Sequence, residues 1–400
     1  MLTWKQRLGV VAGNACEFYD IALFAAISGY ITVEFQQAGM GNSTYIVWGI
    51  FALRFLIRPL GGYIIGLYAD HYGRKAALIL TSTVIGLSTL TMAVLPISKL
   101  GAAAPLLFLI LQMLQAFSFG GEYPTIIHYL LSESEQKQRA KISSMIVASS
   151  LVGVLMSLLI VYFINNLLSP EEMQQIGWRI PLLIALVNIA ISFYFRQKLK
   201  EISPCVIKNQ GITLLAVLKI FLIVIPGAVV FYVQNLASTL SKRALDNGTL
   251  QTLYPLLSSS LLLVFVLFIG WLTDKYSTPQ KIFRLGIYAL LIAAAPLYLL
   301  LASKSVVLVI IAQLALTLIA ALILSNLAAV LFEKSANKTA ILGLGYNAAL
   351  SVFGGLSPLI IALLIPFGGL FPGIYVAASG VAFVVAGYIP AIRKSTCCTK

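Results

Sequence analysis

Apolar residues along the chain fall in repeated runs of about 20, separated by short charged or Gly/Pro-rich segments. A run of this length crosses a hydrocarbon core of roughly 30 Å when it forms an α-helix. The pattern therefore predicts twelve helical spans, at residues 9–34, 45–68, 76–95, 102–131, 141–166, 180–195, 213–238, 253–273, 282–302, 305–331, 340–364 and 369–391.

The longest polar interruption, residues 196–211, lies at the middle of the chain and separates six spans from six. We expect an N-terminal six-helix bundle over 1–200, a cytoplasmic linker over 201–211 and a C-terminal six-helix bundle over 212–400. A repeat supports this division, because the GxxxD spacing of the segment 66–70 recurs at 270–274, 204 residues later and at the same place in each half. Parallel six-helix repeats are one plan of membrane transporters.

Composition and charge agree with a membrane protein. Hydrophobic residues make up 60% of the chain and charged residues only 10%, which excludes an ordinary soluble enzyme. The net charge is +14, and nineteen basic residues, Arg196 among them, fall in segments on the side of both termini, against five on the other side. This bias predicts cytoplasmic termini and accounts for the charge without a nucleic-acid partner.

Motifs of catalysis or metal binding do not occur. The four cysteines show neither zinc-site spacing nor a disulfide framework, and no HExxH, P-loop or GxSxG motif is present. We therefore expect no enzyme activity, no catalytic residues, no metal and no cofactor.

Five ionisable residues lie well inside the predicted spans: Glu17, Asp20, Arg54, Arg58 and Glu122. Each would cost about 2.5–3.5 kcal/mol at the centre of a lipid-facing helix, so we expect them to face inward and to contact one another. The two arginines and three acids of the spans balance only if one carboxyl holds a proton.

Four segments of the first half form a series of motifs in order. They read GNACEFYD at 13–20, RPLGG at 58–62 continuing to GLYADHYGRK at 66–75, QAFSFGGEY at 115–123, and GWRIP at 177–181. In these segments the chain resembles the major facilitator superfamily, specifically its metabolite:proton symporter branch, which includes proline/betaine, dicarboxylate, citrate and shikimate transporters. Two departures are His71, in place of a basic residue, and Arg54, in place of glycine.

The resemblance implies an all-α polytopic membrane protein with twelve transmembrane helices in two pseudo-symmetric six-helix bundles, the major facilitator fold. It also implies a multi-pass protein of the bacterial inner membrane. Its partners would be a small-molecule substrate, protons and the lipid bilayer, with no nucleic acid, and we expect a monomer.

The buried charges suggest how protons are coupled. We assign proton coupling to Glu17, Asp20, Arg58 and Glu122, one carboxyl holding the proton while an arginine pairs with the deprotonated form. The alternative is a permanent ion-pair network that only locks the first, second and fourth helices together.

Substrate contacts are expected on the spans that line the cavity of the resembled family, which are the first, fourth, seventh and tenth. Arg54 is also a candidate, because a guanidinium binds a carboxylate in a bidentate fork; its alternative is a second pairing with Glu17 or Glu122. Interhelical hydrogen bonding is the alternative role for each polar candidate. The expected substrate-binding residues are Asn14, Tyr19, Arg54, Tyr123, Tyr232, Gln234, Asn235, Gln313 and Asn326.

The repeated loop motif is expected to form a gate. Asp70 can accept hydrogen bonds from backbone N–H groups at a helix start, and Asp274 is its counterpart in the second half. A solvated basic loop is the alternative. The expected gating residues are Gly66, Asp70, Gly73, Arg74, Glu133, Arg139 and Asp274.

The sequence therefore favours proton-coupled symport of a small polar metabolite, such as an organic acid, an amino acid or a betaine-like molecule, by alternating access. The alternative is a facilitator or exporter of larger polar cargo, such as a siderophore, without proton coupling.

Overall fold

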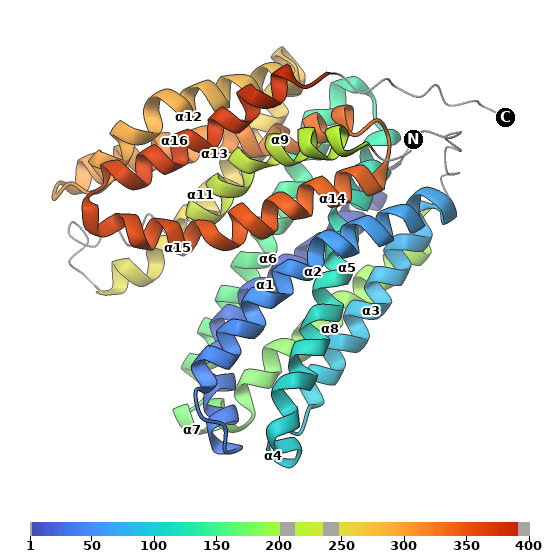
Figure 1. Ribbon diagram of the computed structural model, residues 1–400, viewed down its shortest axis with the longest axis vertical. Coiled ribbons are helices and arrows are strands. Elements are labelled where there is room, and N and C mark those ends of the chain that lie inside the picture. The colour runs from blue at the N-terminus through green and yellow to red at the C-terminus, as the bar shows by residue number, and fades with distance from the viewer. Residues whose placement is uncertain (1, 201–212, 235–247, 391–400) are drawn as a thin grey trace. The chain divides into compact units, whose positions relative to one another are not determined.

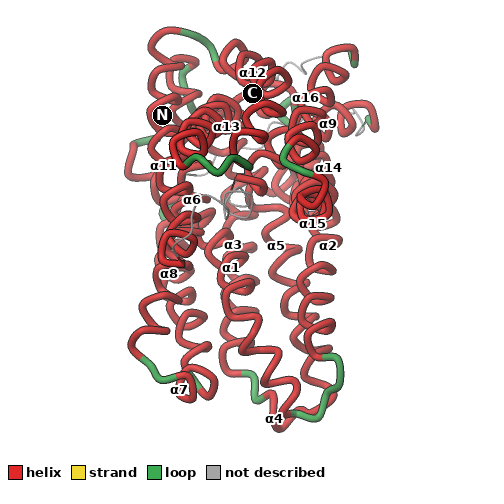
Figure 2. Tube along the Cα trace, turned by 90° about the vertical axis from the view of Figure 1, so that its left-hand side faces the viewer, coloured by secondary structure: helices red, strands yellow, loops and turns green. Residues whose placement is uncertain are grey.

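The computed structural model describes residues 2–200, 213–234 and 248–390. These residues are largely helical and include no strand (Figure 2). Contacts divide the chain into two compact units: unit 1 is Met1–Leu130 with Ser149–Cys205, and unit 2 is Leu131–Ala148 with Val206–Lys400. The segment 131–148 thus groups with the second half, whereas the expected halves placed it in the first. The expected linker, 201–211, lies outside the described residues.

The helices of the first half are separated by short turns and by short helices. Helix α6 passes from unit 2 into unit 1 at residues 148–149. The bounds are α1 (Trp4–Gln37), α2 (Ser43–Tyr72), α3 (Arg74–Val94), α4 (Ile97–Leu100), η1 (Gly101–Ala103), α5 (Ala104–Ser132), η2 (Gln136–Gln138), α6 (Arg139–Leu167), α7 (Pro170–Gln175), η3 (Gly177–Arg179) and α8 (Ile180–Gln197).

The helices of the second half belong to unit 2 and are drawn from yellow-green to red in Figure 1. Their bounds are α9 (Leu214–Val233), α11 (Gly248–Tyr276), α12 (Pro279–Leu301), α13 (Val306–Lys334), α14 (Thr339–Ala349), the π-helical turn η6 (Leu350–Gly354), α15 (Gly355–Leu364), η7 (Ile365–Phe367) and α16 (Leu370–Tyr388).

Twelve helical segments of the described chain are long and apolar enough to cross a membrane, which confirms the predicted number of spans. The eleventh span differs from a plain helix, because η6 interrupts it between α14 and α15. Pro358 follows Gly354 by four residues, so it cannot donate a hydrogen bond to the Gly354 carbonyl and its ring crowds that carbonyl. The ladder shifts to a π turn at this point.

Local sequence signals set several helix ends. Thr3 and Gln6 form a capping box that starts α1. A single residue, Gly73, separates α2 from α3. Its φ is +100°, a backbone conformation that residues other than glycine rarely adopt. The glycine of the loop motif therefore allows the chain to reverse between two spans in one residue.

Equivalent helices pack in the same way in the two units. In unit 1, the sixth span α8 packs on the first span α1 and the third span α3. In unit 2, the sixth span α16 packs on α9 and α12, which are the first and third spans of that half (Figure 1). The repeated pairing fits the internal duplication that the GxxxD spacing predicts.

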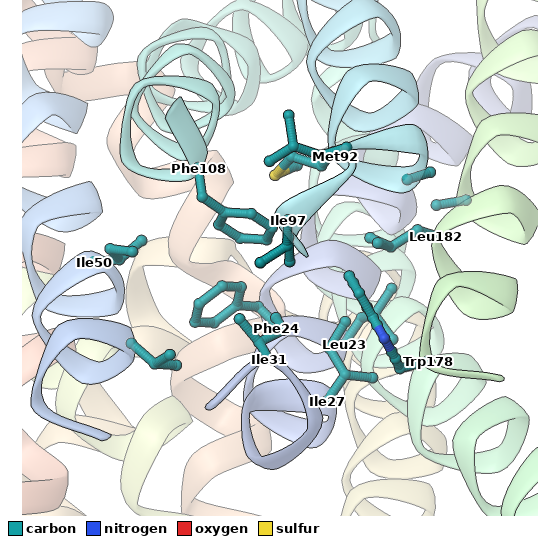
Figure 3. Close-up of a cluster of buried hydrophobic side chains, with 14 of the residues drawn as sticks. Leu23, Phe24, Ile27, Ile31, Ile50, Met92, Ile97, Phe108, Trp178 and Leu182 are labelled. Atoms are coloured by element: carbon teal, nitrogen blue, oxygen red, sulfur yellow. The ribbon is translucent and has the colours of Figure 1, made fainter. Parts of the chain in front are cut away.

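The apolar core of unit 1 gathers side chains from most of its helices. Figure 3 shows Phe24 of α1, Phe108 of α5 and Trp178 of η3 within this cluster. The Phe24 and Phe108 rings have centroids 6.1 Å apart, within the range of favourable aromatic contacts. This core holds α1, α5 and α8 in place around the charged residues described next.

Candidate functional site

Buried ion pairs connect helices in the described part of unit 1. Each of the six side chains belongs to a residue that is at most 4% exposed. Their burial agrees with the expectation that intramembrane charges face inward and meet. The pairs are Arg58 with Glu17, Arg54 with Asp20, and Arg196 with Glu122.

The first two pairs join α1 to α2. Glu17 and Asp20 are three residues apart on α1, and Arg54 and Arg58 are four apart on α2, so each helix presents two charges on one face. Arg54 Nη2 lies 3.3 Å from Asp20 Oδ2, and Arg58 bonds Glu17 Oε1. Arg54 therefore pairs with Asp20, a partner that the sequence did not single out.

The third pair corrects the expected charge balance. The sequence placed Arg196 in a cytoplasmic loop, but the residue lies in the last turn of α8 and is 1% exposed. Its guanidinium bonds Glu122 and Ser82, and its Nη1 donates to Leu78 O at 3.0 Å. Three arginines therefore face three acids, so the cluster is neutral when every member is ionised, and the predicted shortage of one proton is wrong.

Space for Arg196 depends on Gly13 of α1. A Cβ atom at Gly13 would lie 1.6 Å from Arg196 Nη2 and 2.8 Å from Ser192 Oγ. No side chain fits at residue 13 while Arg196 reaches Glu122. Gly13, the first residue of the GNACEFYD segment, thus leaves the space that the Arg196 guanidinium needs to reach Glu122.

A chain of amides surrounds Asp20. Gln115 Nε2 donates to Asp20 Oδ1 at 3.3 Å and to Thr89 Oγ1 at 2.7 Å. Gln112 Nε2 donates to Gln115 Oε1 at 3.2 Å. Both Asp20 oxygens therefore accept a hydrogen bond. Sequence reasoning did not single out these amides, although Gln115 precedes Glu122 by seven residues, which places both on one face of α5.

The other predicted ligands of the first half are buried and contact neighbouring helices. Asn14 Nδ2 donates to Ser149 Oγ at 2.9 Å and to Ser150 Oγ at 2.7 Å, joining α1 to α6. The Tyr19 hydroxyl donates to Pro181 O of α8 at 2.9 Å. Tyr123 of α5 is 3% exposed. The bonds of Asn14 and Tyr19 are interhelical, the alternative role that the sequence left open.

Two predicted ligands of the second half come together in unit 2. Gln234 Nε2 donates to Thr317 Oγ1 at 2.6 Å, and Gln313 Nε2 donates to the same oxygen at 3.1 Å and to Ser258 Oγ at 3.1 Å. The Tyr254 hydroxyl donates to Gln313 Oε1 at 2.6 Å. These side chains form an uncharged polar cluster on α11, α13 and the residue that follows the end of α9. Sequence reasoning found this cluster only in part.

The remaining substrate-binding candidates of this half are Asn326, Tyr232 and Asn235. Asn326 is buried and donates to Leu322 O and Ser325 Oγ of its own helix, at 3.1 and 2.9 Å. Tyr232 is partly exposed, and its ring lies where a Cβ on Gly354 would meet it, at 2.7 Å. Asn235 lies outside the described residues.

The predicted gating residues of the first loop motif lie at the junction of α2 and α3. Gly66 is buried in α2, Asp70 is partly exposed near the end of that helix, and Gly73 forms the turn. Arg74 starts α3, and its Nη1 donates to His128 O of α5 at 3.1 Å. The expected helix-capping role of Asp70 stays a prediction.

The second motif shows such a cap within unit 2. Asp274 Oδ1 accepts from the N–H of Ala140 at 3.0 Å, and Oδ2 accepts from the N–H of Lys141 at 2.8 Å. A carboxylate at the start of α6 is also stabilised by the helix dipole. Arg139 Nη1 lies 3.3 Å from Glu333 Oε1 of α13, so the start of α6 has two acidic partners on α11 and α13. Glu133 follows the end of α5 and is partly exposed.

The profile of the Major Facilitator Superfamily matches residues 10–358. The chain belongs to this superfamily. The resemblance in the first-half motifs is thereby confirmed, as are the fold class of twelve spans and the assignment as a multi-pass membrane transporter and not an enzyme. Among the described residues, no group of three or more His, Cys, Asp or Glu side chains is placed to bind a metal ion.

Relatives within the superfamily match almost the whole chain. A putative proline/betaine transporter of Staphylococcus aureus is 29% identical, over 96% of this chain and 88% of its own length. A citrate-proton symporter of Klebsiella pneumoniae is 27% identical over 95% and 90%, and a shikimate transporter of Escherichia coli is 25% identical over 91% and 88%.

Solved structures of major facilitators share the fold. The proton:xylose symporter XylE, bound to 6-bromo-6-deoxy-D-glucose, gives a TM-score of 0.77 at 14% identity, over 98% of this chain and 97% of its own. The human organic anion transporter MFSD10 gives 0.65 at 16% identity, over 97% and 100%. At these identities the likeness concerns the fold alone.

Proposed function

We propose that this major facilitator is a proton-coupled symporter that carries a small polar metabolite by alternating access. Three buried ion pairs in unit 1 are the observation that carries the proposal. Relatives named as a citrate-proton symporter, a shikimate transporter and a putative proline/betaine transporter support the same class of cargo. The cargo class is an organic acid, an amino acid or a betaine-like molecule.

Coupling follows from the cost of an unpaired buried charge. Adding a proton to one of the carboxyls neutralises it and leaves its arginine without an anion, and breaking a buried pair costs about 3–5 kcal/mol. The transporter relieves this cost by rearranging the paired helices or by binding an anionic group of the cargo. One proton moving down ~100 mV supplies about 2.3 kcal/mol, so the energies are comparable.

Two groups of side chains are the proposed contacts for cargo. Arg54 becomes available to a carboxylate when Asp20 is protonated, because the same guanidinium atom then has no anionic partner in that pair. The uncharged cluster of Gln234 and Gln313 in unit 2 offers amides and hydroxyls to the polar atoms of a metabolite.

The gate is assigned to the loop motifs. The Asp274 cap on α6 and the Arg139 pair with Glu333 are contacts that open and close during transport. We place both termini in the cytoplasm, on the charge bias of the loops, and the protein in the bacterial inner membrane as a monomer.

One observation favours a second candidate function. Because the six charges balance without an added proton, the pairs also suit a permanent network that fixes α1, α2, α5 and α8. The chain would then be a facilitator or exporter of larger polar cargo, such as a siderophore, without proton coupling.

Uptake into proteoliposomes separates the two functions. Purified protein is first screened by thermal shift with proline, betaine, citrate and shikimate, and the compounds that stabilise it are then tested for uptake. Symport predicts that an inward pH gradient accumulates the compound above its external concentration and that a protonophore abolishes this accumulation. Equal uptake with and without the gradient would establish the facilitator.

A further inference from the structure

A small cavity lies beside the Glu122 and Arg196 pair inside unit 1. Its walls come from four helices, with Gly13 and Cys16 on α1, Ser82 on α3, Glu122 on α5, and Ser192 and Arg196 on α8. About 10 Å³ of it is open to the centre of a water molecule, close to the smallest space that holds one water. Cys16, one of the lining residues, is itself partly exposed.

Three polar atoms of the residues that line this cavity have no hydrogen-bond partner in the protein: Glu122 Oε2, Ser192 Oγ and Arg196 Nε. Their residues are at most 2% exposed, so each atom would carry a desolvation cost of about 1–3 kcal/mol if nothing bonded it. Buried waters typically make two to four hydrogen bonds to such groups. Arg196 Nε–H can donate to a water that in turn donates to Glu122 Oε2 and bonds the Ser192 hydroxyl.

The other two carboxyls differ from Glu122 in this respect. Both oxygens of Asp20 accept hydrogen bonds, one from Gln115 and one from Arg54. Glu17 has a buried oxygen without a hydrogen-bond partner, but it does not line this cavity. Glu122 therefore combines an oxygen that has no hydrogen-bond partner in the protein with a place in the lining of this polar, water-sized cavity.

We propose that this cavity binds one water molecule and that Glu122 takes up and releases the coupled proton through it. The inference rests on the proposed function, because it names the carboxyl at which coupling occurs. In the step, a proton carried by the water passes to Glu122 Oε2, the carboxylate becomes a neutral acid, and the water remains. On release, the same O–H bond breaks and the proton returns to the water.

Arg196 has other hydrogen-bond partners that allow its ion pair with Glu122 to break. When Glu122 becomes neutral, Arg196 keeps its bonds to Ser82 Oγ and Leu78 O, so the guanidinium is not left without partners. The charged or titratable groups near Glu122 are Arg196 on α8 and, on α1, Cys16 and Glu17, the latter paired with Arg58 of α2. The wall that α3 contributes is uncharged.

Infrared difference spectroscopy tests the proposal on the full chain in liposomes. Lowering the pH of the wild type should produce the carbonyl band of a protonated carboxylic acid. We expect Glu122→Gln to lose the band and Glu17→Gln and Asp20→Asn to retain it. Retention in Glu122→Gln, or loss in either of the other two variants, would overturn the assignment. If Glu122→Gln does not fold, the double variant Glu122→Gln/Arg196→Gln replaces it, because no buried charge is then left unpaired.

The water itself is tested by Ser192→Ala, which removes one of its partners. We expect this variant to shift the carboxyl band and to slow its hydrogen–deuterium exchange. The matched control is Ser157→Ala, a fully buried serine on α6 that lies outside the cavity and also has no hydrogen-bond partner. Identical spectra for Ser192→Ala and the wild type would overturn the water site.

Uptake measured on the same samples distinguishes this inference from the proposed function. Uptake driven by a pH gradient in the wild type, with the band retained in Glu122→Gln, would reject Glu122 as the site and leave symport standing. Uptake independent of the gradient would reject symport itself, whichever carboxyl carries the band.

Discussion

Arg196 reaches from the last turn of α8 to the carboxylate of Glu122 on α5, 74 residues away in the sequence. The contact joins two helices of unit 1 that are not adjacent in the chain. With Arg196 included, three arginines pair with three acids. A proton that binds to any of these carboxylates must therefore break an existing ion pair. Under the proposed symport, the stability of the resting protein and its coupling to protons therefore depend on the same contacts.

The first prediction concerns the space that Arg196 occupies. Gly13→Ala places a methyl group 1.6 Å from Arg196 Nη2, which forces the guanidinium away from Glu122. Losing a buried pair costs about 3–5 kcal/mol, so we expect a clearly lower midpoint of thermal unfolding. The control is Gly29→Ala on the same helix, where a Cβ has no neighbour within 4 Å. Equal midpoints for the two variants would contradict the buried position of Arg196.

The second prediction uses the pair between α1 and α2. Asp20→Asn leaves the Arg54 guanidinium buried without its acid, so we expect a loss of about 3–5 kcal/mol in the free energy of unfolding. The double variant Asp20→Asn/Arg54→Gln should recover most of this loss, because both charges are gone. Chemical denaturation in detergent measures the cycle, and additive effects of the two substitutions would show that the residues do not interact.

The third prediction concerns the cap on α6. Asp274→Ala removes the acceptor of the Ala140 and Lys141 amides, and losing such a cap costs about 0.5–2 kcal/mol. Hydrogen–deuterium exchange should show faster exchange of these two amides. Glu135→Gln is the control, since Glu135 is exposed and its side chain caps no helix. Unchanged protection in Asp274→Ala would mean that the cap does not form.

The fourth prediction concerns Lys219, a cation that belongs to none of the three buried ion pairs. Lys219 Nζ donates to Ile389 O at 2.7 Å and to Pro390 O at 3.4 Å, just beyond the end of α16. A cation at a helix C-terminus stabilises it by about 0.3–1 kcal/mol, and by up to ~2 kcal/mol when partly buried. We expect Lys219→Met to unfold at a lower temperature and Lys219→Arg to behave like the wild type, while cargo uptake per folded protein stays the same in both. A selective loss of proton-driven uptake in Lys219→Met would assign Lys219 to coupling instead.

Much of the fold was predictable because an apolar run of about 20 residues spans a bilayer as an α-helix, which satisfies its backbone hydrogen bonds internally. The spans, their number and the burial of Glu17, Asp20, Arg54, Arg58 and Glu122 follow from hydrophobicity and insertion cost. The π turn between α14 and α15 was not predicted, since a proline inside an apolar run does not by itself distinguish a kink from a π turn.

The pairing within the site was less predictable. Arg196 stands near Lys198 and Lys200, so its surroundings resemble a cytoplasmic rim, and only the three-dimensional structure shows its long side chain turned inward. Gly13 was visible as a motif residue, but its role depends on Arg196 of α8, 183 residues further along the chain. The amides around Asp20 carry no charge, so the cost of inserting them into a bilayer does not predict that they contact Asp20.

Proton movement driven by cargo tests the central claim most directly. Proteoliposomes containing the purified protein and an internal pH dye receive an inward gradient of a compound that the protein binds, with no imposed pH gradient. Proton symport predicts acidification of the interior at a rate that follows cargo uptake and that falls to the protein-free rate in the Asp20→Asn/Arg54→Gln and Glu122→Gln/Arg196→Gln variants. Cargo entry without any internal pH change in the wild type would contradict it.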